Sequence, residues 1–100
     1  MFTYWSLKKY GTKLLPTLEK RYGKHEFYSA HQIRATVYQK DFNPRFLPLG
    51  YILFLTPCEL NEVFSREFPE MDIEAYKQEI ISYLANKNYE GQLQVLKQAS

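Results

Sequence analysis

Apolar side chains recur every three or four positions along most of this chain, and this spacing limits its fold more than any other feature. The clearest example is the stripe formed by Ile73, Tyr76, Ile80, Tyr83 and Leu84. Residues at such intervals share one face of an α-helix, whereas the apolar residues of a half-buried strand alternate at every second position. The spacing predicts an all-α protein, a compact bundle of five to six short helices.

Three start signals indicate where helices begin. Ser29, followed three residues later by Gln32, matches a capping box, in which each side chain bonds the other residue's backbone N–H. Residues 56–59 (TPCE) combine an N-cap Thr, a Pro at the first helical position and a Glu at the third. Asp72 precedes the stripe described above. We therefore expect helices to begin at residues 30, 57 and 73.

The two ends of the chain give weaker helix signals. Residues 3–22 have apolar side chains at helical offsets, but Gly11 weakens the middle, and Pro16 is expected to bend or restart the helix. Near the C-terminus, Leu93 and Leu96 predict one more short helix.

The apolar run at residues 48–55 (PLGYILFL) is ambiguous, because a short run of this kind is typical of a buried strand as much as of a buried helix. No second strand-like run stands nearby to pair with a strand here. We therefore predict a buried helix, and the alternative is an α+β protein with a short strand near 49–55.

Length and cysteine content predict one domain in a reducing compartment. The 100 residues contain no linker or low-complexity tract, so we expect a single domain over 1–100. The lone Cys58 excludes an internal disulfide. No apolar run approaches the roughly 20 residues that span a bilayer, and no secretory signal is recognisable at the start. We expect a cytoplasmic protein without integral membrane insertion.

Charge is divided unevenly between the two halves. Residues 1–50 carry nine basic and three acidic side chains, a net charge of +6, whereas residues 51–100 carry four basic and eight acidic ones, a net charge of −4. The halves would attract each other if they pack together, which requires no partner. Alternatively, the basic half binds an acidic protein, nucleic acid or lipid headgroups. The residues predicted to bind such a partner are Lys9, Lys13, Lys20, Arg21 and Lys24.

The sequence contains no recognisable motif for catalysis, metal binding or nucleotide binding, so we expect no metal, no cofactor and no enzyme activity. His25 and His31 are six residues apart, not the four that place two imidazoles on one metal. The acids within residues 67–74 lack the spacing of a calcium loop and favour a helix start instead. The open alternative is an enzyme whose site is assembled from scattered residues such as His31, Tyr28 and Cys58.

Three fragments carry a resemblance to known proteins: KRYG at residues 20–23, YSAHQI at 28–33 and CELNEVF at 58–64. Over roughly residues 8–84 the chain resembles a small family of uncharacterised bacterial proteins, a domain of unknown function. The resemblance implies a compact helical fold and a bacterial cytoplasmic setting. It implies no catalytic residue.

Three functions remain as hypotheses. The leading one is a small non-enzymatic helical interaction or regulatory protein. The second is weak non-specific nucleic-acid binding through the basic N-terminal half; specific DNA recognition is disfavoured because the apolar helix at 48–55 has no side chains to read base edges. The third is an enzyme with a site that the sequence does not reveal.

Overall fold

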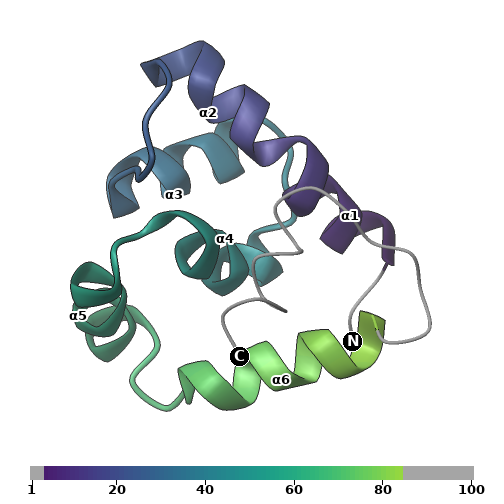
Figure 1. Cartoon of the computed structure of the whole chain (residues 1–100), viewed down its shortest axis with the longest axis vertical. Helices are drawn as coiled ribbons and strands as arrows, with labels where there is room; N and C mark the ends of the chain where they lie inside the picture. Colours follow the sequence, from purple (N-terminus) through teal and green to yellow (C-terminus); the bar gives the residue numbers. More distant parts are fainter. Residues whose placement is uncertain (1–3, 85–100) are drawn as a thin grey trace.

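The computed structural model describes residues 4–84 as six α-helices and one 3-10 turn (Figure 1). In chain order these are α1 (Tyr4–Thr12), α2 (Leu14–Tyr22), α3 (Ala30–Gln39), η1 (Pro44–Phe46), α4 (Leu47–Phe54), α5 (Pro57–Glu67) and α6 (Ile73–Leu84). The all-α prediction is confirmed for these residues, and the short helix predicted around Leu93 and Leu96 lies outside them. Within residues 4–84, no helix has the length and apolar character that crossing a bilayer would require.

Helix α4 lies in the middle of the other helices (Figure 1). Seven of its eight residues are buried, which explains why its sequence is apolar on every side. Helices α2, α3 and α4 pack in succession, and α5 packs on α4. The buried helix predicted for residues 48–55 is thus confirmed, and the alternative of a strand near 49–55 is wrong.

Gly50 lets α4 approach three other helices closely at the centre of the core. A Cβ atom at this position would lie 3.1 Å from Ile33 Cγ2 on α3 and 3.4 Å from Tyr10 Cε2 on α1. It would also lie 3.5 Å from Leu14 Cδ2 on α2. The missing side chain of Gly50 therefore allows α4 to contact α1, α2 and α3 closely.

The N-terminal helical segment is divided where the sequence indicated. Helix α1 ends at Thr12 and α2 begins at Leu14, which places Pro16 in the first turn of α2. Proline has no N–H to donate, and its ring crowds the carbonyl of the residue four positions earlier, here Thr12. The break therefore precedes the proline by one turn.

The three predicted helix starts are also confirmed. Ser29 Oγ accepts a hydrogen bond from Gln32 N at 3.1 Å, and Gln32 Oε1 accepts one from Ser29 N at 3.0 Å, which completes the capping box. Thr56 Oγ1 accepts from Glu59 N at 3.3 Å. Asp72 Oδ1 accepts from the backbone N–H groups two and three residues later, at 2.9 and 3.2 Å. Local side-chain chemistry thus sets the starts of α3, α5 and α6.

Candidate functional site

Helices α5 and α6 diverge from the turn at residues 68–72, which we call the elbow (Figure 1). Each helix buries part of its apolar stripe in the core, through Val63 and Phe64 on α5 and through Tyr76 on α6. The remaining apolar side chains near the elbow are only partly buried. The divergence of the two helices therefore leaves apolar surface between them.

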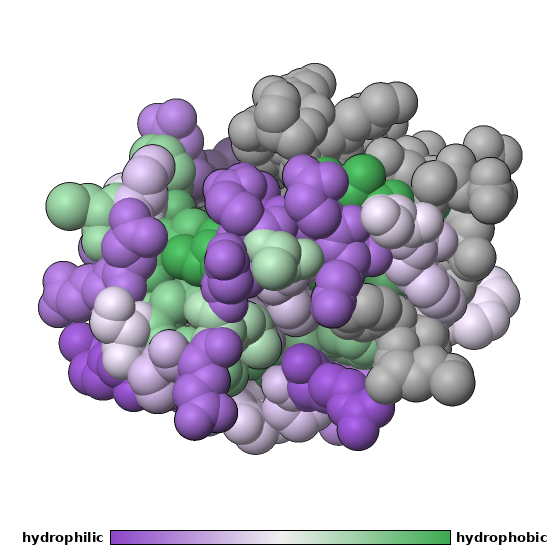
Figure 2. Space-filling view, turned by 90° about the horizontal axis from the view of Figure 1, so that it is seen from below, coloured by the Kyte–Doolittle hydropathy of each residue, from purple (hydrophilic) through white to green (hydrophobic). Residues whose placement is uncertain are grey.

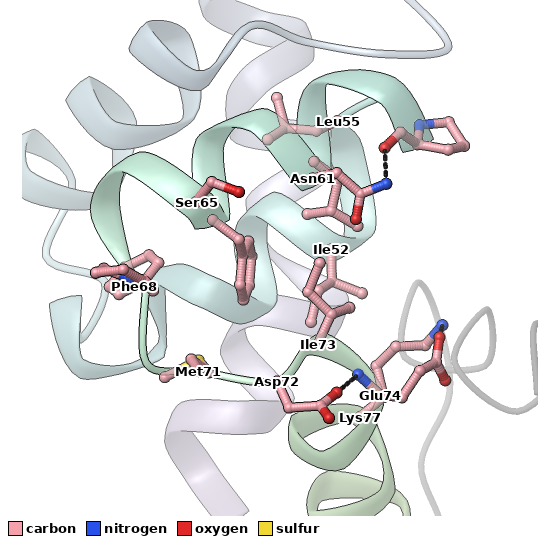
Figure 3. Close-up of a pocket in the computed structure, with 14 residues that line it drawn as sticks. Ile52, Leu55, Asn61, Ser65, Phe68, Met71, Asp72, Ile73, Glu74 and Lys77 are labelled. Atoms are coloured by element: carbon pink, nitrogen blue, oxygen red, sulfur yellow. Dashed lines mark hydrogen bonds and ion pairs between the residues drawn. The ribbon is translucent and has the colours of Figure 1, made fainter.

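A groove of about 600 Å³ lies between α5, the end of α4 and the start of α6. We call it the α5–α6 groove. Apolar side chains from all three helices line it: Ile52, Leu55, Leu60, Phe64, Phe68 and Ile73. Figure 3 shows Ile52 of α4 and Ile73 of α6 projecting into the groove, with Asn61 and Ser65 along its edge. Three separate helices thus build one concave apolar surface.

A second hollow, of about 540 Å³, adjoins the groove at the elbow. It shares Phe68, Pro69, Met71 and Asp72 with the groove. Its other lining residues include several carboxylates, and we call it the acidic hollow. The acids lining it are Glu67, Glu70, Asp72 and Glu79.

The charge around the elbow is strongly negative. From α5 through α6, residues 57–84 hold seven acidic and two basic side chains, a net charge of −5. Lys77 is the only basic residue among the described residues that line the two hollows, and its Nζ lies 3.4 Å from Glu74 Oε1. Figure 2, which brings α6 to the front, shows hydrophobic side chains gathered between hydrophilic ones on this face. The apolar groove therefore has an acidic border.

A polar network fixes the C-terminal end of α5, beside the acidic hollow. Arg34 Nη1 on α3 donates to Glu67 Oε2 at 2.6 Å and to the hydroxyl of Tyr51 at 3.0 Å. The Tyr51 hydroxyl in turn donates to Glu67 Oε1 at 2.8 Å. Burial, together with the hydrogen bond to Glu67, raises the pKa of Tyr51 to about 12, so the phenol keeps its proton at neutral pH. The network joins α3, α4 and α5.

Sequence reasoning missed both the groove and this network. One signal for the network was available: Tyr51 stands in an otherwise apolar helix, and a buried tyrosine hydroxyl needs a hydrogen-bond partner. The groove had no comparable signal, because helical periodicity does not reveal which part of an apolar stripe remains uncovered.

The five predicted basic residues are divided between two roles. Lys9 Nζ donates to Asp41 O at 2.9 Å and lies 4.9 Å from the centre of the Phe42 ring. Arg21 Nη2 donates to Gln39 Oε1, so α2 is tied to α3. Lys9 and Arg21 therefore serve contacts within the protein. The other three basic side chains are exposed: Lys13, Lys20 and Lys24.

The scattered residues considered for an enzyme site are not joined. The Tyr28 hydroxyl donates to Gly23 O at 2.7 Å and accepts from His25 N at 3.2 Å, which orders the loop before α3. His31 and Cys58 are exposed near the starts of α3 and α5. Among residues 4–84, no hydrogen bond or ring contact links Tyr28, His31 and Cys58. No group of three or more His, Cys, Asp or Glu in this range is placed to hold a metal ion.

Comparison with known proteins gives a family but no activity. A family model described as a family of unknown function (DUF6559) matches residues 1–98. No curated protein and no solved structure matches the chain. The resemblance to a domain of unknown function is thus confirmed over nearly the whole sequence.

Proposed function

Since the chain belongs to this family of unknown function, we propose from its own surface that it is a non-enzymatic interaction module that binds a partner protein in the α5–α6 groove. The observation that carries the proposal is the apolar groove of about 600 Å³ built by three helices. Concave apolar surfaces with polar edges are typical of binding sites.

The groove has apolar surface left to bury. Leu60, Phe68 and Ile73 line it and are only partly covered by the rest of the protein. Removing such surface from water is favourable by about 25 cal/mol per Å². A partner that inserts apolar side chains between α5 and α6 would cover all three residues.

The walls of the groove are ordered before any partner binds. Helices rather than loops supply most of the lining, and Arg34, Tyr51 and Glu67 hold the end of α5 in place. A site that is already ordered loses less conformational entropy on binding. This rigidity supports a docking role.

The exposed basic side chains support a second candidate function, weak non-specific nucleic-acid binding. Lys13 and Lys20 are seven positions apart, which places them on one face of the helical segment, and Lys24 follows shortly after its end. Such a basic face binds the phosphate groups of nucleic acid whatever the base sequence.

We also propose a cytoplasmic location. Cys58 is the lone cysteine of the chain. Its thiol is exposed and free, so it forms no disulfide within the chain. Free thiols of this kind persist in reducing compartments. Fractionation of cells that express the tagged protein tests this, and recovery from a secreted fraction would contradict it.

Site-specific photo-crosslinking tests the docking role of the groove. Benzoylphenylalanine replaces Ser65, which lines the groove, or Ser82, which is exposed on α6 and lines neither hollow. Irradiation in cells of the encoding organism should give a protein adduct from position 65 and not from position 82. Identical adducts from both positions, or none from position 65, would overturn the proposal.

A pair of variants makes the crosslinking test specific. Leu60→Glu places a charge in the groove, whereas Gln78→Glu adds the same charge at an exposed position outside both hollows. The adduct from position 65 should disappear with Leu60→Glu and persist with Gln78→Glu. Circular dichroism melting shows whether each variant remains folded.

A further inference from the structure

The shape of the α5–α6 groove favours a helix as its occupant. Leu60, Phe64 and Phe68 are spaced four residues apart and line the groove along α5 and its end. Side chains at this spacing form a ridge beside which the side chains of a second helix pack. Helix α5 has 11 residues and, at 1.5 Å per residue, is about 16 Å long, which matches about three turns of a partner helix.

The border of the groove indicates the charge of that helix. Glu67 is paired with Arg34 at 2.6 Å, and Glu74 with Lys77 at 3.4 Å. Glu70 and Glu79, which line the acidic hollow, have no ion pair within residues 4–84. Asp72 lies where the groove meets the acidic hollow. The local field therefore attracts cations and repels anionic groups.

We propose that the α5–α6 groove receives an amphipathic α-helix of a partner protein with an apolar stripe and flanking Lys or Arg residues. The inference rests on the proposed docking function and adds the chemistry of the partner. The apolar stripe fills the space between Leu60 and Ile73. The basic side chains beside the stripe reach Glu70, Asp72 and Glu79. This is the helix-in-groove mode of recognition, with charge as the selective element.

Three synthetic 18-residue peptides test the inference. They share one stripe of Leu and Ile at helical spacing and carry Lys, Gln or Glu at the remaining positions. Fluorescence anisotropy with the full chain should show the Lys peptide binding at least tenfold more tightly than the Gln peptide, and the Glu peptide most weakly. The advantage of the Lys peptide should shrink as salt is raised, because exposed charges are screened.

Charge-reversal variants locate the effect. Glu70→Lys with Glu79→Lys should invert the order of the Lys and Glu peptides. The matched control, Glu26→Lys with Glu62→Lys, makes the same change in net charge at exposed positions that line neither hollow, and it should leave the order unchanged. Leu60→Glu should weaken all three peptides.

The outcomes separate this inference from the docking function itself. Equal binding of the three peptides, insensitive to salt, would overturn the charge selection and leave the groove as a docking site. Binding by none of them would overturn the helix as occupant, while the adduct from position 65 still decides whether the groove binds a protein. An inversion in the control variant as large as in the Glu70 and Glu79 variant would reduce the effect to net charge and overturn the inference.

Discussion

The hydroxyl of Tyr51, in the middle of the buried helix α4, donates a hydrogen bond to Glu67 at the last residue of α5 over 2.8 Å. The two residues are 16 positions apart in sequence, and Arg34 on α3 bonds both of them. This relationship couples the core to the end of α5 that borders the acidic hollow. It gives the core a direct influence on the shape of the candidate site.

Replacement of Tyr51 tests this coupling. In Tyr51→Phe, Glu67 and Arg34 each lose one hydrogen-bond partner, while the ring still fills its place in the core. We expect the free energy of unfolding to fall by about 1.5–3 kcal/mol, as for hydrogen bonds that involve a charged group. Urea denaturation measures it. Tyr38→Phe is the control, because Tyr38 is exposed and its loss should change stability by less than about 0.5 kcal/mol.

The same tyrosine should make stability depend on pH in the alkaline range. Its pKa is about 12 in the folded protein, against 10.0 as the ordinary value for the unfolded chain. A raised pKa means that the folded state holds the proton more tightly than the unfolded chain does. The contribution of Tyr51 to the free energy of unfolding is therefore complete below about pH 10 and is lost as pH rises toward 12. Wild type should therefore lose more stability than Tyr51→Phe between these values. Parallel curves for the two proteins would contradict the assignment.

Much of the fold, and little of the candidate site, follows from the sequence. Ser29, Thr56 and Asp72 cap helices through bonds to backbone N–H groups two or three residues away, so local spacing was sufficient to find those starts. The groove depends on the angle between α5 and α6, which no short segment encodes. Phe68 and Ile73 fall on ordinary apolar stripes, and only their partial burial distinguishes them from core residues.

The predicted basic site illustrates the same limit. Lys9 and Lys13 look alike in sequence, yet Lys9 reaches the backbone of Asp41, 32 positions away, while Lys13 is exposed. Charge patterns show how many bases a segment holds. They do not show which of them the protein uses internally, because the internal acceptor lies in a distant part of the chain.

Two substitutions at Gly50 should change the free energy of unfolding by different amounts. Gly50→Ala should change the free energy of unfolding by less than about 1 kcal/mol, because the gain in helix propensity offsets the 3.1 Å approach of the new Cβ to Ile33 Cγ2. Gly50→Leu should destabilise by about 1–3 kcal/mol or more, since Ile33, Tyr10 and Leu14 leave no room for a longer side chain. Urea denaturation of both variants checks this, and a stable Gly50→Leu protein would show that the helices do not meet closely there.

Lys9 should behave as a structural residue. In Lys9→Ala, the bond to Asp41 O and the contact with the Phe42 ring are lost, and we expect a destabilisation of about 1 kcal/mol. Lys13→Ala removes a neighbouring exposed lysine and should leave the free energy of unfolding nearly unchanged. Thermal melting at matched ionic strength compares the two, and equal losses would mean that the contacts of Lys9 contribute nothing.

The exposed lysines provide the test of the second candidate function. If nucleic acid binds the basic face, the triple variant Lys13→Glu, Lys20→Glu, Lys24→Glu should lose affinity for single-stranded DNA at low salt. Phosphate neutralisation releases counterions, so the affinity of the wild type should fall steeply as salt rises.

A matched triple variant, Lys40→Glu, Arg45→Glu, Arg66→Glu, makes the same change in net charge at other exposed positions and should retain more of the binding. Equal losses in the two variants would mean that DNA responds to total charge rather than to this face. Absence of any shift with the wild type would remove nucleic acid as a partner and leave the α5–α6 groove as the candidate site.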